Sequence, residues 1–139
     1  MRLELTILAW GCVLALVHLF GAAQVKTRQY GPKWNMGARD EKLPDPKPVV
    51  GRWMRAQANF FETFPLAAAA ILILSVADIH TRSTELGAVL WLAGRVVYLP
   101  LYAAGVPVVR TLVFLVSLVG ILMMLWPVLS AGIPASTLF

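Results

Sequence analysis

One stretch decides how this chain folds: RWMRAQANFFETFPL, residues 52–66, which opens an apolar segment. In a helix with 3.6 residues per turn, four of its polar side chains fall within about 80° of one another. They are Arg52, Arg55, Asn59 and Glu62, whereas Gln57 points to roughly the opposite side. We expect Glu62 to be buried in the apolar zone. A glutamate there is costly unless it is paired or faces water, so this face predicts a functional site. The alternative is two interfacial arginine anchors and an internal salt-bridge partner.

The composition indicates an integral membrane protein rather than a soluble one. Of the 139 residues, 59% are hydrophobic and only 14% are charged, and the mean hydropathy is +0.74. This length allows one small domain, residues 1–139. The net charge is +5, but eight of the twelve Lys and Arg residues lie between Lys26 and Arg55. We therefore interpret the basic excess as a topology signal, and we expect no nucleic-acid partner.

Four apolar segments predict an all-α integral membrane bundle of four transmembrane helices. We expect these helices at about residues 3–25, 52–77, 84–104 and 109–130. A cleaved signal peptide is the alternative for the first segment. Glycines and prolines prevent a continuous helix over residues 26–51, which we expect to form a structured surface loop, or alternatively a solvated linker. The basic excess predicts a cytoplasmic position for this loop and a multi-pass topology.

The sequence predicts neither a disulfide nor a metal site. Cys12 is the only cysteine and lies in an apolar segment, so we expect a small core residue there. His18 and His80 have no second ligand at metal spacing, and both are expected to be structural.

Further polar residues follow in the third and fourth predicted helices. Arg95, Tyr98 and Tyr102 are spaced three and four residues apart and share one helix face, and Arg110 opens the last helix. Arginine forks bind carboxylates, glutamate holds an ammonium group and amides suit peptide groups. The pattern therefore predicts a site for a small, negatively charged, peptide-like zwitterion, beside an apolar wall that suits a lipophilic second substrate.

Three motifs resemble one known family. The motif RAQxNxxExFP, residues 55–65, resembles the signature of the MAPEG family, the membrane-associated proteins of eicosanoid and glutathione metabolism. The motifs GRxxYxxxY (94–102) and PxxR (107–110) are also similar to that family, in particular to leukotriene C4 synthase and the microsomal glutathione S-transferases. Thr63 stands where the leukotriene C4 synthase branch has a tyrosine. The loop sequence GARD, residues 37–40, resembles that of bacterial members.

This resemblance implies a homotrimer that binds glutathione as co-substrate between protomers, near the cytoplasmic surface. The residues that it implies for one protomer's side of the pocket are Arg55, Asn59, Glu62, Tyr98 and Tyr102. It implies that Gln57 and a basic residue at the end of the first helix, here Arg28, reach in from the neighbour. Arg52 and Arg95 join the predicted glutathione-binding set because they share the same helix faces.

Arg110 is the predicted catalytic residue. A guanidinium beside the glutathione sulfur stabilises the thiolate, which is the nucleophile, and the start of a helix adds positive potential. We thus expect a glutathione transferase or peroxidase of the bacterial inner membrane, acting on lipophilic electrophiles or hydroperoxides. The alternatives are a non-catalytic trimeric lipid-binding or scaffold protein of the same family, and a small transporter or channel. Arg110 would then be an interfacial anchor.

Overall fold

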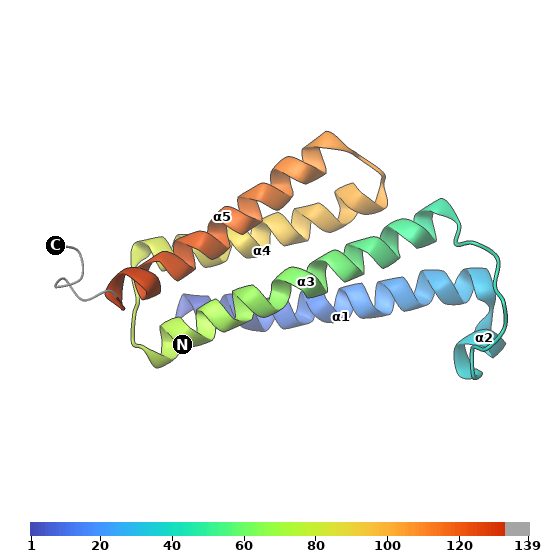
Figure 1. The fold of residues 1–139 in the computed structure, drawn as a ribbon, viewed down its shortest axis with the longest axis horizontal. Helices are drawn as coiled ribbons and strands as arrows, with labels where there is room; N and C mark the ends of the chain where they lie inside the picture. Colours follow the sequence, from blue (N-terminus) through green and yellow to red (C-terminus); the bar gives the residue numbers. More distant parts are fainter. Residues whose placement is uncertain (133–139) are drawn as a thin grey trace.

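The computed structural model describes residues 1–132, which fold into five α-helices (Figure 1). They are α1 (Leu3–Tyr30), α2 (Pro32–Met36), α3 (Pro48–Val76), α4 (Arg82–Ala103) and α5 (Val108–Ala131). Within the described residues, every helix except α2 is long and apolar enough to cross a membrane. The prediction of an all-helical fold with four spans is confirmed, and the chain is an integral, multi-pass membrane protein.

Two of the long helices extend further than their apolar residues predict. α1 was expected to end near residue 25 but continues to Tyr30, and it stops where Gly31 adopts a φ of 94°. α3 was expected from residue 52 but starts at Pro48, because proline fits the first turn of a helix. The connection between them therefore spans residues 31–47 rather than 26–51, and it contains α2.

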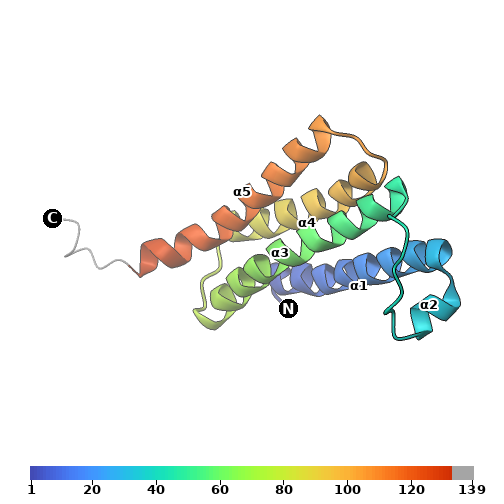
Figure 2. The same cartoon turned by 45° about the vertical axis from the view of Figure 1, so that its right-hand side comes forward.

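The helices form two pairs, α1 with α3 and α4 with α5, and α3 and α1 also contact α4 (Figures 1 and 2). The N-terminus lies beside the turn between α3 and α4, at residues 1–6 and 76–85; we call this the N-terminal end. The opposite end holds α2, the start of α3 and the turn between α4 and α5, at residues 26–55 and 102–110; we call this the hairpin end (Figure 1).

An aromatic column joins the two pairs in the core. The ring of Phe60 stacks on His18 at 4.5 Å between centroids and on Phe64 at 5.2 Å, and Phe64 stacks on Trp91 at 5.8 Å. His18, Phe60 and Trp91 are fully buried, which agrees with a structural role for His18. Through these rings, α1, α3 and α4 share one core.

Cys12 does not belong to this core, so the prediction of a small core residue is wrong. Its neighbour Gly11 occupies the close contact instead, since a Cβ on Gly11 would lie 2.8 Å from the Trp91 ring. The next side chain along a helix turns about 100° away, which directs Cys12 outward.

A polar network closes the N-terminal end. The buried Glu4 carboxylate accepts hydrogen bonds from the Thr84 hydroxyl at 2.7 Å and pairs with His80 Nδ1 at 3.0 Å. The other nitrogen of His80 lies 3.3 Å from Glu85. Thr81 and Thr84 form a capping box at the start of α4. These contacts attach the start of α1 to the turn between α3 and α4.

A seam of small residues sets the distance between α4 and α5. A Cβ on Gly120 would lie 2.4 Å from the Gly87 carbonyl oxygen and 2.7 Å from the Trp91 amide nitrogen. A Cβ on Gly94 would lie 2.9 Å from the Cβ of Ser117. The backbones of the two helices therefore approach closely, as small residues permit in membrane bundles.

Gly120→Val is expected to lower the stability by about 1–3 kcal/mol, because the added atoms overlap backbone that cannot move aside. Thermal unfolding in detergent measures this. Gly132→Val is the matched control, since a Cβ there would lie 3.6 Å from its nearest neighbour among residues 1–132. Equal unfolding temperatures for the two variants would contradict the close approach.

Candidate functional site

Three arginines converge on the last turn of α4 at the hairpin end. Arg55 Nε donates to the hydroxyl of Tyr102 at 3.1 Å, and the Arg110 guanidinium lies 4.4 Å from the centroid of the same ring. Arg52 Nε donates to the carbonyl of Ala103 at 2.8 Å. Within residues 1–132, none of the three guanidiniums has a carboxylate at ion-pair distance. The cluster is therefore a concentration of positive charge without a counter-ion in the described part of the protomer.

Arg95 lies in the interior next to this cluster. Its side chain is fully buried, and the guanidinium faces the rings of Tyr98 at 4.6 Å, Phe60 at 5.5 Å and Phe114 at 5.5 Å. The Tyr98 ring in turn lies 5.5 Å from that of Tyr102, so aromatic contacts connect Arg95 to the arginine cluster. The three rings stabilise the cation in part, but no nitrogen of the guanidinium has a hydrogen-bond partner within the described residues.

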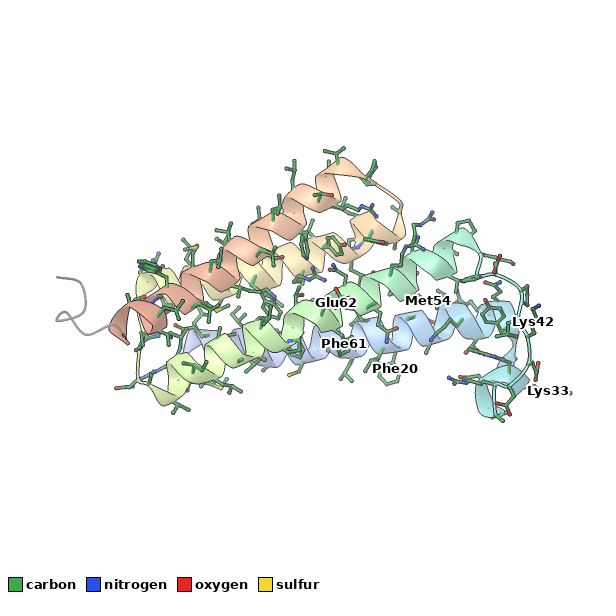
Figure 3. The ribbon with its side chains drawn as sticks, viewed as in Figure 1. Phe20, Lys33, Lys42, Met54, Phe61 and Glu62 are labelled. Atoms are coloured by element: carbon green, nitrogen blue, oxygen red, sulfur yellow. The ribbon has the colours of Figure 1, made fainter. Side chains whose placement is uncertain are left out.

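Asn59 and Glu62 follow the arginines along the same face of α3. Asn59 is half-buried, and its Oδ1 is enclosed without a hydrogen-bond partner in the described chain. Glu62 is exposed, on the edge of α3 nearer to α4 (Figure 3). The expectation that Glu62 is buried in the apolar zone is wrong for one protomer, because no other helix of the same chain covers its carboxylate. An ion pair between Glu62 and Arg95 is likewise absent from the described residues.

Gln57 lies on a different face of α3, as the helical period predicts. It lines a groove of about 390 Å³ between α1 and α3, together with Lys26 and Met54. The apolar wall of this groove consists of Leu19, Ala58 and Phe61. Figure 3 shows Phe61 on the edge of α3 nearer to α1. Gln57 is therefore separated from the arginine cluster within one protomer.

Arg28 lies in a separate pocket, with Lys47, and not in the groove of Gln57. The basic residue that shares that groove is Lys26, which sequence reasoning did not select. Its position could have been found from the helical period, since Lys26 follows Leu19 by seven residues and so lies on the same face.

Sequence reasoning also missed the ring of Phe114, which completes the enclosure of Arg95. Phe114 follows Arg110 by four residues, so the two lie on one side of α5. The structure thus brings together Arg52, Arg55, Arg95, Tyr98, Tyr102 and Arg110. It sets apart Gln57 with Lys26, and Arg28 with Lys47.

Arg95→Met is expected to leave the unfolding temperature in detergent unchanged or higher. Methionine fills a similar volume, and the substitution removes a buried cation that has no hydrogen-bond partner. Arg95→Ala is expected to lower the stability by about 2–5 kcal/mol, because it leaves a cavity among the three rings. If both variants lose the same stability, the contacts of the cation with the rings outweigh the cost of burying it.

Comparison with protein-family models gives a match over nearly the whole chain. The model of the MAPEG family matches residues 7–130, which include most of all four long helices. Members of this family use glutathione; some are glutathione transferases or related enzymes, and others are non-catalytic. No curated protein matches the chain.

Proposed function

The chain belongs to the MAPEG family, and we propose that it is a membrane-bound enzyme that ionises the thiol of glutathione for attack on a lipophilic electrophile or hydroperoxide. The observation that carries this proposal is the group of Arg52, Arg55 and Arg110 around the last turn of α4, which lacks a counter-ion in the described protomer. Glutathione carries two carboxylates and an ionisable thiol, and this cluster suits all three anionic groups.

Each polar group has a chemically matched role toward glutathione. Arg55 binds a carboxylate through the nitrogens that do not bond Tyr102, and Arg52 does so through those that do not bond Ala103. The amide of Asn59, whose oxygen is unpartnered, suits a peptide group of the tripeptide. Glu62 suits the ammonium group. Tyr98 and Tyr102 supply hydroxyl groups beside the cluster, and Arg95 adds positive potential from behind them.

A neighbouring copy of the chain completes the site in this proposal. Glu62 is exposed on a helix that crosses the membrane, and a carboxylate in that position needs a partner or water. Gln57 and Lys26 face away from their own protomer's arginine cluster, so they are available to a neighbour. We therefore assign the basic residue that reaches in from the neighbour to Lys26 in place of Arg28, within a homotrimer.

The chemical step begins with transfer of the thiol proton to water, which Arg110 favours by stabilising the thiolate that remains. The sulfur then forms a bond to the electrophilic carbon, and the leaving group departs with the electron pair of the broken bond. With a hydroperoxide, two glutathione molecules are oxidised to the disulfide while the O–O bond is reduced to an alcohol and water. The second substrate enters from the lipid, since the long helices lie in the membrane.

The basic excess at the hairpin end supports a cytoplasmic position for this end, where glutathione is available. Six of the basic residues lie in residues 26–47, and we propose the bacterial inner membrane with this connection on the inner side. Both ends of the bundle carry polar groups, but within the described residues the clusters of cations without a counter-ion lie at the hairpin end.

One observation favours the alternative of a non-catalytic lipid-binding protein. A mostly apolar groove of about 430 Å³ lies along α5, between Val119 and Leu129, with Ser83 of α4 at its edge. Such a groove suits an acyl chain. The two functions differ in whether bound glutathione reacts.

Arg110→Ala is expected to keep glutathione affinity within a few-fold and to lower the rate of transfer to a model electrophile by about 10²–10³. The charge that Arg110 stabilises develops on the sulfur, whereas the carboxylates bind elsewhere. Initial rates at saturating glutathione, with affinity measured by calorimetry, check this.

Arg82→Ala is the control, since Arg82 is exposed at the N-terminal end of the bundle. Arg110→Lys should be intermediate, because it keeps the charge but loses the fork. If Arg110→Ala turns over at the wild-type rate, then Arg110 is only an interfacial anchor. If the wild-type protein itself shows no turnover, the lipid-binding alternative is supported.

A further inference from the structure

A second cationic pocket lies at the hairpin end, apart from the arginine cluster. It has a volume of about 250 Å³ and lies between the last turns of α1 and the start of α3. Arg28 and Lys47 bring two positive charges into it, from different segments of the chain. The remaining lining residues are Val25, Gln29, Val49 and Val50.

Side-chain hydrogen bonds fix the shape of this pocket. The amide of Gln29 donates to the carbonyl of Asp45 at 3.0 Å and accepts from the backbone N–H of Lys47 at 2.8 Å. The hydroxyl of Tyr30 donates to the carbonyl of Pro44 at 3.0 Å. These three bonds hold the segment before α3 against the end of α1. The backbone of Lys47 is therefore held at the end of α1 by the fold, and its side chain lines the same pocket as Arg28.

The two cations have no counter-ion among the described residues. Neither Arg28 nor Lys47 has a carboxylate at ion-pair distance, and neither side chain makes a hydrogen bond within residues 1–132. Val49 and Val50 belong to the first turn of α3, which has no side-chain cap, and the start of that helix adds partial positive charge. Like charges held together in this way favour an anionic ligand.

The depth of the pocket in the membrane indicates which anion it meets. The apolar run of α1 ends at Ala23, and Arg28 follows it by five residues, which is about 7.5 Å along a helix. The headgroup layer on each side of the hydrocarbon is about 5–7.5 Å thick, so Arg28 lies at the outer edge of this layer, within reach of lipid phosphates. The valine side chains offer an apolar wall to the part of the lipid below the phosphate.

From the pocket, its two cations and its depth, we infer that Arg28 and Lys47 bind the phosphate of an anionic phospholipid, in a site distinct from that of glutathione. The bound lipid would hold the connection between α1 and α3 on the membrane surface. A free phosphate ester carries the same anionic group as the lipid headgroup, so a competition experiment distinguishes the two.

The test uses the full chain, purified in a neutral detergent and titrated with phosphatidylglycerol or phosphatidylcholine. Native mass spectrometry counts the bound lipids. The wild type is expected to prefer phosphatidylglycerol about 30-fold, since each cation near a lipid surface contributes roughly a factor of five. Arg28→Gln with Lys47→Gln is expected to lose this preference.

Lys33→Gln with Lys42→Gln is the matched control, because it removes the same charge from exposed residues of the same connection, outside the pocket (Figure 3). This control is expected to keep the preference. An equal loss in both double variants would assign the effect to diffuse surface charge and overturn the inference, as would a wild type without preference.

Two further measurements separate the sources of the anion. Glycerol phosphate is expected not to displace the lipid. If it does so at equal concentration, the ligand is a free phosphate ester and the assignment to a phospholipid is overturned. Glutathione affinity is measured in the same variants. If the double variant Arg28→Gln with Lys47→Gln loses glutathione affinity but keeps its lipid preference, then Arg28 belongs to the glutathione site and the inference fails.

Discussion

The phenol of Tyr102 is the contact on which the hairpin end depends. Its hydroxyl accepts a hydrogen bond from Arg55 of α3, and its ring faces the guanidinium of Arg110 of α5. Arg52 adds a hydrogen bond to the carbonyl of Ala103, one residue further along α4. Three helices thus meet through cations and one aromatic ring rather than through ion pairs. This arrangement joins the helices while leaving most guanidinium nitrogens free for an anionic ligand.

The two ends of the bundle use their charges differently. At the N-terminal end, Glu4 and Glu85 flank His80, and Arg2 pairs with Asp78, so each of these carboxylates has a basic partner. At the hairpin end the arginines outnumber the acids near them, and two separate sets of cations have no counter-ion in the described chain. Paired charges stabilise contacts within the fold, whereas cations without a partner in the protomer are available to an external anion. The cations that we propose as ligand-binding groups are therefore concentrated at the hairpin end.

The sequence predicted the helices well because apolar runs of membrane length are a strong signal, but their ends followed other rules. α1 and α3 continue past the apolar residues to Tyr30 and Pro48, where a glycine with positive φ and a first-turn proline decide the boundaries. The separation of Gln57 from the other polar residues of α3 followed from the 3.6-residue period alone.

Burial was less predictable, because it depends on which helix covers each face. Glu62 was expected inside and is exposed in the protomer, and Cys12 was expected in the core and faces outward. Lys26 was overlooked because the choice of Arg28 rested on family resemblance, whereas the helical period places Lys26 on the face of Leu19, in the groove that it shares with Gln57. The central claim, that the cluster around Tyr102 binds glutathione and ionises its thiol, is tested most directly by titrating the purified wild-type protein with glutathione at neutral pH. Calorimetry and ultraviolet thiolate absorbance should together show saturable binding with ionisation of the bound thiol; the absence of both saturation and a thiolate signal would contradict the claim.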